Sequence, residues 1–420
     1  MLRKSAVLPL LALTAIVGGC GVVLTRGSQV LPGPGMGTPT AQTPAPSPSK
    51  PAEPQLKWGV VVVAKDGLVW LPVDDTAGAQ RMIESGPSPG EGLSAAISPD
   101  HRKVALFNQR GELRIFDLQT GRATVVTIVG EGDRQFVGSH PWARSSEQLA
   151  FVKDGNLYVA ELDGTSRRIT RTGDATSFAW APGGGQIAFG RRDKKDHDVG
   201  LWLVTFGPPR EAPKLSMLAP PNTENAVFAA SAPTYGAQEG LAYLRSWEGG
   251  GLCFAGGKTP QVDVDSAWFP LYWLPGDSAV VYNSFNPETG SEGLKRCAQG
   301  GKPEPLVSQP VLSFDVHEDQ ILVAVNKTPA GATEPLGSFD LMVIGPDGQQ
   351  RLKGWSATLQ GSDAECRWCP DGSRVAVLAQ GLDHKSDPAS DLLVGAPGGE
   401  LKPLGSGAQW LVGWAAVPES

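Results

Sequence analysis

Short hydrophobic runs separated by turn residues fill most of this chain. Within a run, large and small side chains alternate, as in Val104-Ala105-Leu106-Phe107 and Ile187-Ala188-Phe189. Runs of this length, bounded by Gly, Pro and Asp, predict β-strands rather than helices. One type of strand recurs at intervals of roughly 45 residues, a spacing typical of repeat architectures. Its starts are Val104, Leu149, Ile187, Leu241, Val280, Ile321 and Val375.

Each repeat unit predicts four antiparallel strands, which we designate a to d. Strand a ends in an anchor, strand b has the large-Ala-aromatic pattern, strand c opens with Leu, and Asp-Gly pairs such as Asp163-Gly164 form the c–d hairpin. Two units, near Ser231 and Val316, have degenerate anchors. The others are Ile97-Ser98-Pro99-Asp100, Trp142-Ala143-Arg144, Trp180-Ala181-Pro182-Gly183, Trp273-Leu274-Pro275-Gly276 and Trp368-Cys369-Pro370-Asp371-Gly372. A fixed period built from short strands and turns predicts an all-β fold, a β-propeller of four-stranded antiparallel blades.

The two ends of the repeat region are partial units that complete each other. Val60 to Lys65, Asp66 to Trp70 and Gln80 to Ile83 align with strands b, c and d, whereas Gln409 to Trp414 resembles a strand a with nothing after it. We expect the N- and C-terminal strands to share one blade, which would leave no sheet edge unpaired. Seven anchored units and this shared one predict eight blades. Seven remains the alternative, because a degenerate unit can be overcounted.

The composition narrows the class of partner. Gly (53 residues) and Pro (36 residues) suit a fold of many tight turns and disfavour long helices. The net charge is −7 at pH 7, with no long run of basic residues. Because binding to nucleic-acid phosphates needs clustered Lys and Arg, nucleic acid is not an expected partner.

The N-terminus has the features of a targeting segment. Arg3 and Lys4 precede an apolar stretch, and Val17-Gly18-Gly19-Cys20 resembles the signal of bacterial lipoproteins. We interpret residues 1–19 as a signal peptide and Cys20 as the site of lipid attachment. The alternative is an uncleaved membrane helix that continues through Leu24. Both interpretations place the rest of the chain on the extracytoplasmic face of a bacterial membrane, which is periplasmic if the cell has an outer membrane.

A proline-rich segment separates this signal from the repeats. Residues 20–56 contain no recurring apolar positions that could pack a core, so we expect a disordered spacer, partly in the polyproline II conformation. The propeller is then expected to occupy residues 57–417.

The repeat phrase resembles a known family. Trp-[Ser/Ala/Cys]-Pro-Asp-Gly, Ile-Ala-Phe, Leu-Tyr-Val, Asp-Gly and Arg-x-Ile-Thr follow one another as in the TolB-type, WD40-like propeller repeat, and Leu149 to Thr170 is the clearest copy. The Trp-Asp pair of true WD40 repeats is absent. The resemblance implies a periplasmic or cell-surface propeller that binds partners. It implies no activity, because the same repeat also forms the non-catalytic domain of prolyl oligopeptidase-like enzymes.

Residues that could carry catalysis are sparse. Gly86-Pro87-Ser88-Pro89-Gly90 matches the Gly-x-Ser-x-Gly string of hydrolases, but its prolines prevent the sharp strand-to-helix turn that positions such a serine. The histidines are not spaced as metal ligands, and the acidic string Asp193 to Asp198 lacks the Gly and Glu positions of an EF-hand loop. We predict no catalytic residue, no metal site and no cofactor.

The cysteines and tryptophans fit structural roles. Cys366 and Cys369 lie on strand a with side chains on opposite faces, and Cys253 and Cys297 occupy matching positions of strand c in neighbouring units. A tryptophan recurs at the anchor position in several units, which favours packing between blades over a carbohydrate-binding surface. These tryptophans are Trp142, Trp180, Trp273, Trp368 and Trp414.

The sequence therefore predicts a membrane-tethered binding protein without catalysis, whose partner is a protein or a component of the cell envelope. The long b–c loops are the expected contact surface, because loops on a rigid scaffold tolerate variation. Two other functions remain open: a signalling modulator that docks on a sensor kinase, and a lyase- or lactonase-like enzyme that uses the central funnel. The candidate partner-binding residues are Asp196, Asp198, Trp247, Asp383 and Asp387.

Overall fold

The computed structural model divides the chain into two units, Met1–Glu53 and Pro54–Ser420, and every described residue belongs to the second. The structure describes residues 56–74, 80–86, 95–130, 133, 136, 140–193, 198–207, 211–221, 230–245, 251–256, 266–286, 291–327, 338–345, 358–360, 363–380 and 390–418. Within these ranges the regular structure is β-strand, apart from one short 3-10 helix at Pro275–Asp277. No helix among these residues is long and apolar enough to cross a membrane.

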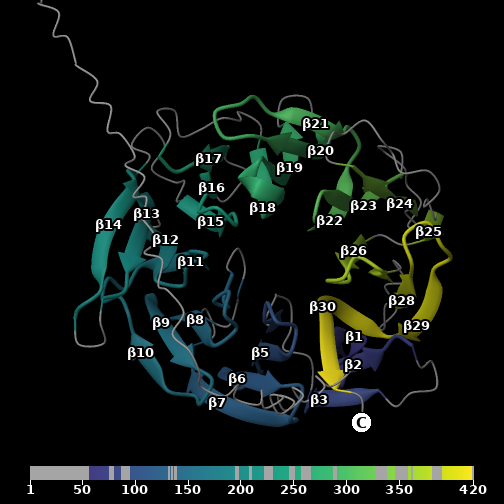
Figure 1. Ribbon diagram of the computed structural model, residues 1–420, viewed down its shortest axis with the longest axis horizontal. Helices are drawn as coiled ribbons and strands as arrows, with labels where there is room; N and C mark the ends of the chain where they lie inside the picture. Colours follow the sequence, from purple (N-terminus) through teal and green to yellow (C-terminus); the bar gives the residue numbers. More distant parts are fainter. Residues whose placement is uncertain are drawn as a thin grey trace, which may run out of the picture. The chain divides into compact units, whose positions relative to one another are not determined.

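Eight antiparallel sheets are arranged in a ring, which confirms the predicted eight-bladed propeller (Figure 1). We number the blades in chain order. Blade 1 contains β4 (Ala95–Ile97), β5 (Lys103–Phe107), β6 (Glu112–Asp117) and β7 (Arg122–Ile128). Blade 2 contains β8 (Gln148–Lys153), β9 (Asn156–Glu161) and β10 (Ser166–Arg168), with Trp142 bridged to Leu149 beside them. Blade 3 contains β11 (Ala175–Trp180), β12 (Gln186–Arg192), β13 (Asp198–Thr205) and β14 (Lys214–Ala219).

The remaining blades follow the same order around the ring. Blade 4 contains β15 (Ala230–Tyr235), β16 (Leu241–Arg245) and β17 (Leu252–Phe254). Blade 5 contains β18 (Ser266–Trp273), β19 (Val280–Asn286), β20 (Ser291–Cys297) and β21 (Glu304–Val307). Blade 6 contains β22 (Val311–His317), β23 (Gln320–Asn326), β24 (Ser338–Ile344) and β25 (Thr358–Gln360). Blade 7 contains β26 (Asp363–Trp368), β27 (Val375–Gln380), β28 (Ser390–Gly395) and β29 (Lys402–Ser406). The first strand of each blade lies nearest the centre of the ring and the last at its periphery (Figure 1).

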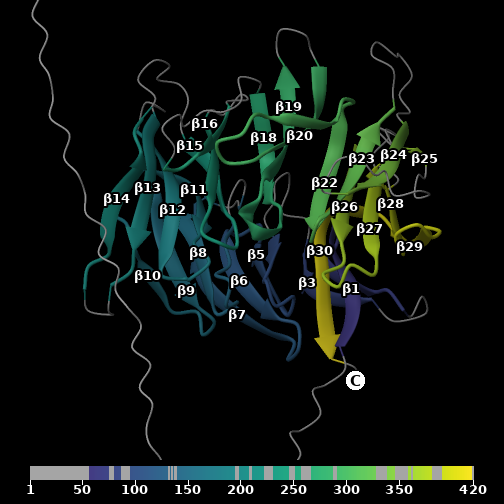
Figure 2. The same ribbon diagram turned by 45° about the horizontal axis from the view of Figure 1, so that its top comes forward.

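Blade 8 is built from both ends of the described chain. It contains β30 (Ala408–Pro418), β1 (Leu56–Ala64), β2 (Gly67–Pro72) and β3 (Arg81–Ser85), in that order. β1 and β30 pair antiparallel, with Val60 opposite Trp414 and Val63 opposite Trp410. Figure 2 shows the two strands side by side. The predicted closure of the ring is therefore confirmed.

The hydrophobic core is divided among the eight blade interfaces. Each cluster of buried residues takes side chains from two neighbouring blades; one, for example, joins Phe107 of blade 1 to Leu149 of blade 2. The small residue of strand b lets the sheets approach, and in six blades it is a fully buried alanine. These alanines are Ala105, Ala150, Ala188, Ala242, Ala324 and Ala376.

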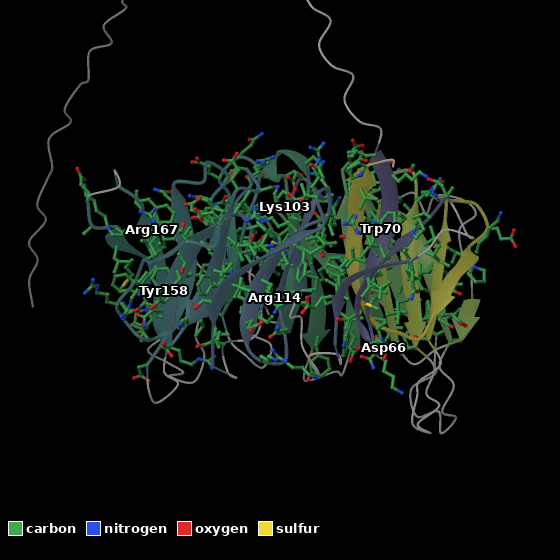
Figure 3. All side chains as sticks on the ribbon, turned by 90° about the horizontal axis from the view of Figure 1, so that it is seen from below. Asp66, Trp70, Lys103, Arg114, Tyr158 and Arg167 are labelled. Carbon is green, nitrogen blue, oxygen red and sulfur yellow. The ribbon has the colours of Figure 1, made fainter. Side chains whose placement is uncertain are left out.

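The ring has two faces that differ in the turns they carry. In an antiparallel blade, the a–b and c–d turns lie at one end of the strands and the b–c turns at the other. We call the first the mouth face and the second the far face. In the side view of Figure 3, Arg167, next to a c–d turn, lies toward the upper side, and Asp66, in a b–c turn, lies at the lower side. Leu56 pairs with Pro418, so both ends of the described chain are at the mouth face.

Candidate functional site

Equivalent residues of the innermost strands form layers around the central channel. The anchor layer contains one residue from each blade, at the end of strand a. In blade order it is Ile97, Trp142, Trp180, Tyr235, Trp273, Val316, Trp368 and Trp414.

The anchor tryptophans hold neighbouring blades together. Trp142 Nε1 donates to Ala96 O at 3.0 Å and Trp180 Nε1 to Pro141 O at 2.9 Å. Trp273 Nε1 donates to Thr234 O and Trp414 Nε1 to Arg367 O, each at 3.1 Å. In every case the acceptor is the carbonyl that precedes the anchor of the previous blade. Together with their burial, these bonds confirm that the tryptophans serve packing.

A second layer is formed by the residue that precedes the anchor in each blade. Its residues are small on five consecutive blades around the ring and large and polar on the other three. In blade order they are Ala96, Pro141, Ala179, Thr234, Tyr272, Asp315, Arg367 and Gly413. Of this layer, Ala179, Thr234 and Tyr272 line the open part of the channel.

A cavity of about 440 Å³ occupies this part of the channel and opens at the mouth face. We call it the channel cavity. Its volume is within the usual range of small-molecule pockets, roughly 300–1,000 Å³. Six blades contribute to its wall. The wall includes Ala179 and Thr234 from the second layer, the aromatic residues Trp142, Trp180, Tyr235, Tyr272 and Trp273, and the charged residues Arg144 and Glu318.

The titratable groups in the inner wall are held in their neutral forms. His140 is exposed to the channel, but desolvation by the surrounding protein lowers its pKa below the ordinary value, which favours the uncharged imidazole at neutral pH. Burial and then the charge of Glu239 raise the pKa of Tyr235 to about 12. Burial and then the Asp315 carboxylate raise the pKa of Tyr272 as well. The wall therefore offers neutral hydrogen-bonding groups between aromatic surfaces.

A polar cluster lies behind Tyr272, on blades 5 to 7. The Tyr272 hydroxyl is hydrogen-bonded to the Asp315 carboxylate, and its ring packs edge-on against Phe314, with centroids 5.4 Å apart. Burial raises the pKa of Asp315, although the Arg367 charge opposes that shift. Burial raises the pKa of Glu365 in the same way. Burial also lowers the pKa of Arg367, but the neighbouring Tyr272 and Asp315 outweigh it, so the net shift is upward.

The two carboxylates of this cluster also bind the exposed backbone edge of the next blade. Asp315 Oδ2 accepts from Trp368 N at 2.7 Å, and Glu365 Oε2 accepts from Leu411 N at 2.8 Å. These two carboxylates were not singled out from the sequence. Asp315 lies in a unit with a degenerate anchor, and Glu365 precedes the complete anchor at Trp368. Neither position carries a carboxylate in the other units, so the repeat pattern did not indicate their proximity.

The residues predicted from the b–c loops are not tested by the structure. Asp196, Trp247, Asp383 and Asp387 lie outside the described residues, as does Cys20. Asp198 begins β13, but its side chain is not described. The channel cavity opens at the mouth face, opposite the face to which these loops belong.

The other candidate groups show structural roles where they are described. Cys253, Cys297, Cys366 and Cys369 are buried thiols rather than disulfides. Cys366 packs between blades 6 and 7 and Cys369 between blades 7 and 8, so the two lie on opposite faces of the sheet, as predicted. Within the described residues, no group of His, Cys, Asp and Glu is arranged to hold a metal ion. Gly86 follows β3, and the rest of the Gly86 to Gly90 string lies outside the described residues.

No protein-family model matches the chain, and no curated protein matches its sequence. Solved structures do resemble it. A dihydro-heme d1 dehydrogenase gives a TM-score of 0.52 at 16% identity, over 88% of this chain and 77% of that one. An oligogalacturonate lyase in complex with manganese gives a TM-score of 0.49 at 15% identity, over 82% of this chain and 98% of that one. A eukaryotic initiation factor gives a TM-score of 0.49 at 12% identity, over 87% of this chain and 98% of that one.

The likeness shows the fold alone. Proteins named as a dehydrogenase, a lyase and an initiation factor all resemble this chain at identities of 16% or less. Because one fold hosts many functions, the function has to be argued from the site.

Proposed function

We propose that this chain is a lipid-anchored, extracytoplasmic binding protein whose channel cavity takes up part of a protein or of a cell-envelope component without altering it chemically. The observation that carries the proposal is the cavity itself. It is open at the mouth face, its wall is formed by rigid elements of six blades, and its inner surface is mostly aromatic and apolar. Such a wall suits binding, because apolar burial supplies affinity and a few fixed polar groups supply orientation.

The neutral state of the inner wall supports binding over proton transfer. A general acid or base works best with a pKa close to the working pH. The pKa of His140 is lowered, and those of Tyr235 and Tyr272 are raised. At neutral pH all three therefore remain hydrogen-bonding groups of fixed protonation.

The tether is supported by the sequence. The Val17-Gly18-Gly19-Cys20 segment and the proline-rich residues after it suit a lipid anchor followed by a spacer. A Cys20→Ser variant is expected to lose acylation and globomycin-sensitive signal processing. If that variant matures and partitions like the parent chain, the anchor is a helix and not a lipid on Cys20.

The binding site is tested by closing the mouth of the cavity. Ala237 is exposed and lines the cavity, so an Ala237→Trp substitution would obstruct it. Ala123 on β7 is also exposed but lies outside the cavity, which makes Ala123→Trp the matched control. In pull-downs from detergent-solubilised membranes, we expect Ala237→Trp to lose partners that the parent chain and Ala123→Trp both capture. Equal capture by all three proteins would contradict the proposal.

The far face is the competing surface for the same function. Charge reversals at Asp196, Asp198, Asp383 and Asp387, or Trp247→Ala, would weaken capture if the b–c loops made the contact. If these changes abolish capture while Ala237→Trp does not, the partner binds the far face.

The polar cluster supports a second candidate function, a lyase- or lactonase-like enzyme that uses the central channel. Asp315 and Glu365 have raised pKa values and lie beside Arg367. Tyr272 is hydrogen-bonded to Asp315 and lines the cavity, so this cluster could exchange protons with a substrate through the Tyr272 hydroxyl. Turnover of lactone or uronate probes by the parent chain, lost in Asp315→Asn and retained in Ala123→Trp, would establish this alternative in place of binding.

A further inference from the structure

The rim of the channel cavity is formed by the residues two positions after the anchor. The rim layer is apolar except at two positions. In blade order it is Pro99, Arg144, Pro182, Ala237, Pro275, Glu318, Pro370 and Ala416. Six of these residues, including both charged ones, line the cavity.

The two charges lie on opposite sides of the ring. Arg144 belongs to blade 2 and Glu318 to blade 6, four blades apart in either direction around a closed ring of eight. In Figure 1, the strands of blade 2 lie at the lower left and those of blade 6 at the upper right. The mouth therefore has a positive pole and a negative pole separated by the width of the cavity.

Both charged side chains are available to a ligand. Arg144 and Glu318 are exposed. Among the residues that the structure describes, neither forms an ion pair, in contrast to Arg114 and Arg191, whose guanidinium groups pair with carboxylates at 2.6–2.9 Å. Glu318 sits in the β22–β23 turn with φ of 50°, a left-handed conformation.

The wall between the poles is mostly apolar and aromatic, and its polar groups are neutral. Leu271, Trp180 and Trp273 belong to it, together with prolines of the rim. The deeper charges lie outside the cavity lining, and Arg367 lies beside Asp315 and Glu365 and offsets part of their charge. A ligand that matches the site would have an apolar body and opposite charges at its two ends.

We propose that the channel cavity binds a small zwitterion, with a carboxylate of the ligand at Arg144, a primary ammonium at Glu318 and an apolar body between them. The chemistry is that of a short peptide with both termini free, or of an amino-acid derivative. Arginine suits a carboxylate because its planar N–H groups match both oxygens. Opposed rim charges also reject the reversed orientation, so they specify the direction of binding more than its strength. This inference rests on the proposed function of the cavity.

The first test uses one tripeptide, Ala-Phe-Ala, in four forms: both termini free, N-acetylated, C-amidated, and blocked at both ends. Binding to the full chain is measured by isothermal titration calorimetry. We expect the free form to bind best and each block to weaken binding by about two- to fivefold, the upper range for an exposed charge pair. Equal affinity of the four forms, or no binding of any form at millimolar concentration, would overturn the inference.

The second test reverses the poles. Arg144→Glu and Glu318→Arg are each expected to weaken the free tripeptide, whereas the double variant restores binding because the zwitterion can turn round. Arg171→Gln and Glu400→Gln, at exposed positions away from the cavity, are the controls and should bind like the parent chain. If the double variant loses as much affinity for the free tripeptide as the two single variants lose together, the two-pole arrangement is contradicted.

The outcome separates this inference from the proposed function. If Ala237→Trp abolishes partner capture but the four tripeptides bind equally or not at all, the cavity is the binding site and its ligand is not a zwitterion. If Ala237→Trp leaves capture unchanged while the blocked tripeptides bind more weakly than the free one, the zwitterion binds but is not what recruits the partner.

Discussion

Trp180 and Trp368 occupy the same position in two blades, yet their indole nitrogens differ. Trp180 Nε1 donates to Pro141 O at 2.9 Å. Trp368 Nε1 is buried without a hydrogen-bond partner, and the Asp315 carboxylate of the previous blade binds the Trp368 backbone N–H instead. An unpaired buried donor costs free energy that a paired one does not. The same residue type should therefore differ in its contribution to stability at the two positions.

This difference can be measured with one substitution at two sites. Trp180→Phe removes one hydrogen bond, while the Pro141 carbonyl still accepts from Ala150 N, so the free energy of unfolding should fall by about 0.5–1.5 kcal/mol beyond the loss of packing. Trp368→Phe loses similar packing but no hydrogen bond. Its free energy of unfolding should therefore fall by about 1 kcal/mol less than that of Trp180→Phe. Urea unfolding followed by fluorescence gives both values. Equal losses at the two sites would refute this explanation.

The buried carboxylate of Asp315 should make stability depend on pH. Burial raises its pKa in the folded chain above the ordinary value of about 3.9, so ionisation is easier in the unfolded chain. The free energy of unfolding is therefore expected to fall as pH rises through the folded pKa. Asp315→Asn removes this titration and should gain stability relative to the parent chain as the pH rises above about 4. Urea melts of the parent chain and Asp315→Asn at several pH values measure this effect. A difference in the free energy of unfolding that stays constant with pH would show that the pKa of Asp315 is not raised.

At the scale of strands, the sequence predicted those elements that recur in every repeat unit. Leu149 to Thr170 contains strands b and c of blade 2, and the structure places them at β8 and β9. The partial units at the two ends were sufficient to predict that β1 and β30 share a blade, because each lacked what the other supplied. Periodicity makes such predictions possible, since the same interactions recur in every blade.

The candidate site could not be predicted in this way, because it depends on residues that differ between blades. Thr234 and Tyr272 occupy the same layer and both line the channel cavity, although they differ in size and chemistry. Arg144 and Glu318 stand where other units have proline or alanine. Nothing in the repeat pattern distinguishes a charge that lines a cavity from one in a solvated turn. The closed ring of eight blades had to be known before opposite positions could be identified.

One close contact in blade 8 fixes the packing of three strands. The Trp70 ring of β2 lies over Gly59 of β1, and its Nε1 donates to Ala415 O of β30 at 3.1 Å. A Cβ at position 59 would lie 2.2 Å from the Trp70 ring. This approach requires a residue without a side chain.

Gly59→Ala should therefore displace Trp70 and weaken the pairing of β1 with its neighbours. We expect a loss of about 1–3 kcal/mol in the free energy of unfolding, the usual cost of overpacking. Gly183→Ala is the control, because a Cβ there meets no atom within 4 Å. It should change stability by less than about 0.5 kcal/mol. Thermal melts in which the two variants behave alike would contradict the close contact.

At the scale of the whole molecule, the ring depends on one non-covalent closure. Removing the chain after Leu404 deletes β30 and leaves the β1 edge and one side of β26 uncovered. Exposed edges invite aggregation, so we expect the truncated chain to aggregate or to lose its cooperative unfolding transition. Removing only residues 419–420 should leave the transition unchanged. A truncated chain that unfolds like the parent would show that the closure is dispensable.

The central claim is that the partner binds at the mouth face. A photo-crosslinking amino acid placed at Gln238 lies beside the cavity rim without lining the cavity, and one placed at Asp66 lies in a turn of the far face. Both positions are exposed. After irradiation of intact cells, adducts are separated by mass and compared between the two positions. The account predicts a defined adduct at Gln238 that is absent at Asp66, and an adduct found only at Asp66 would contradict it.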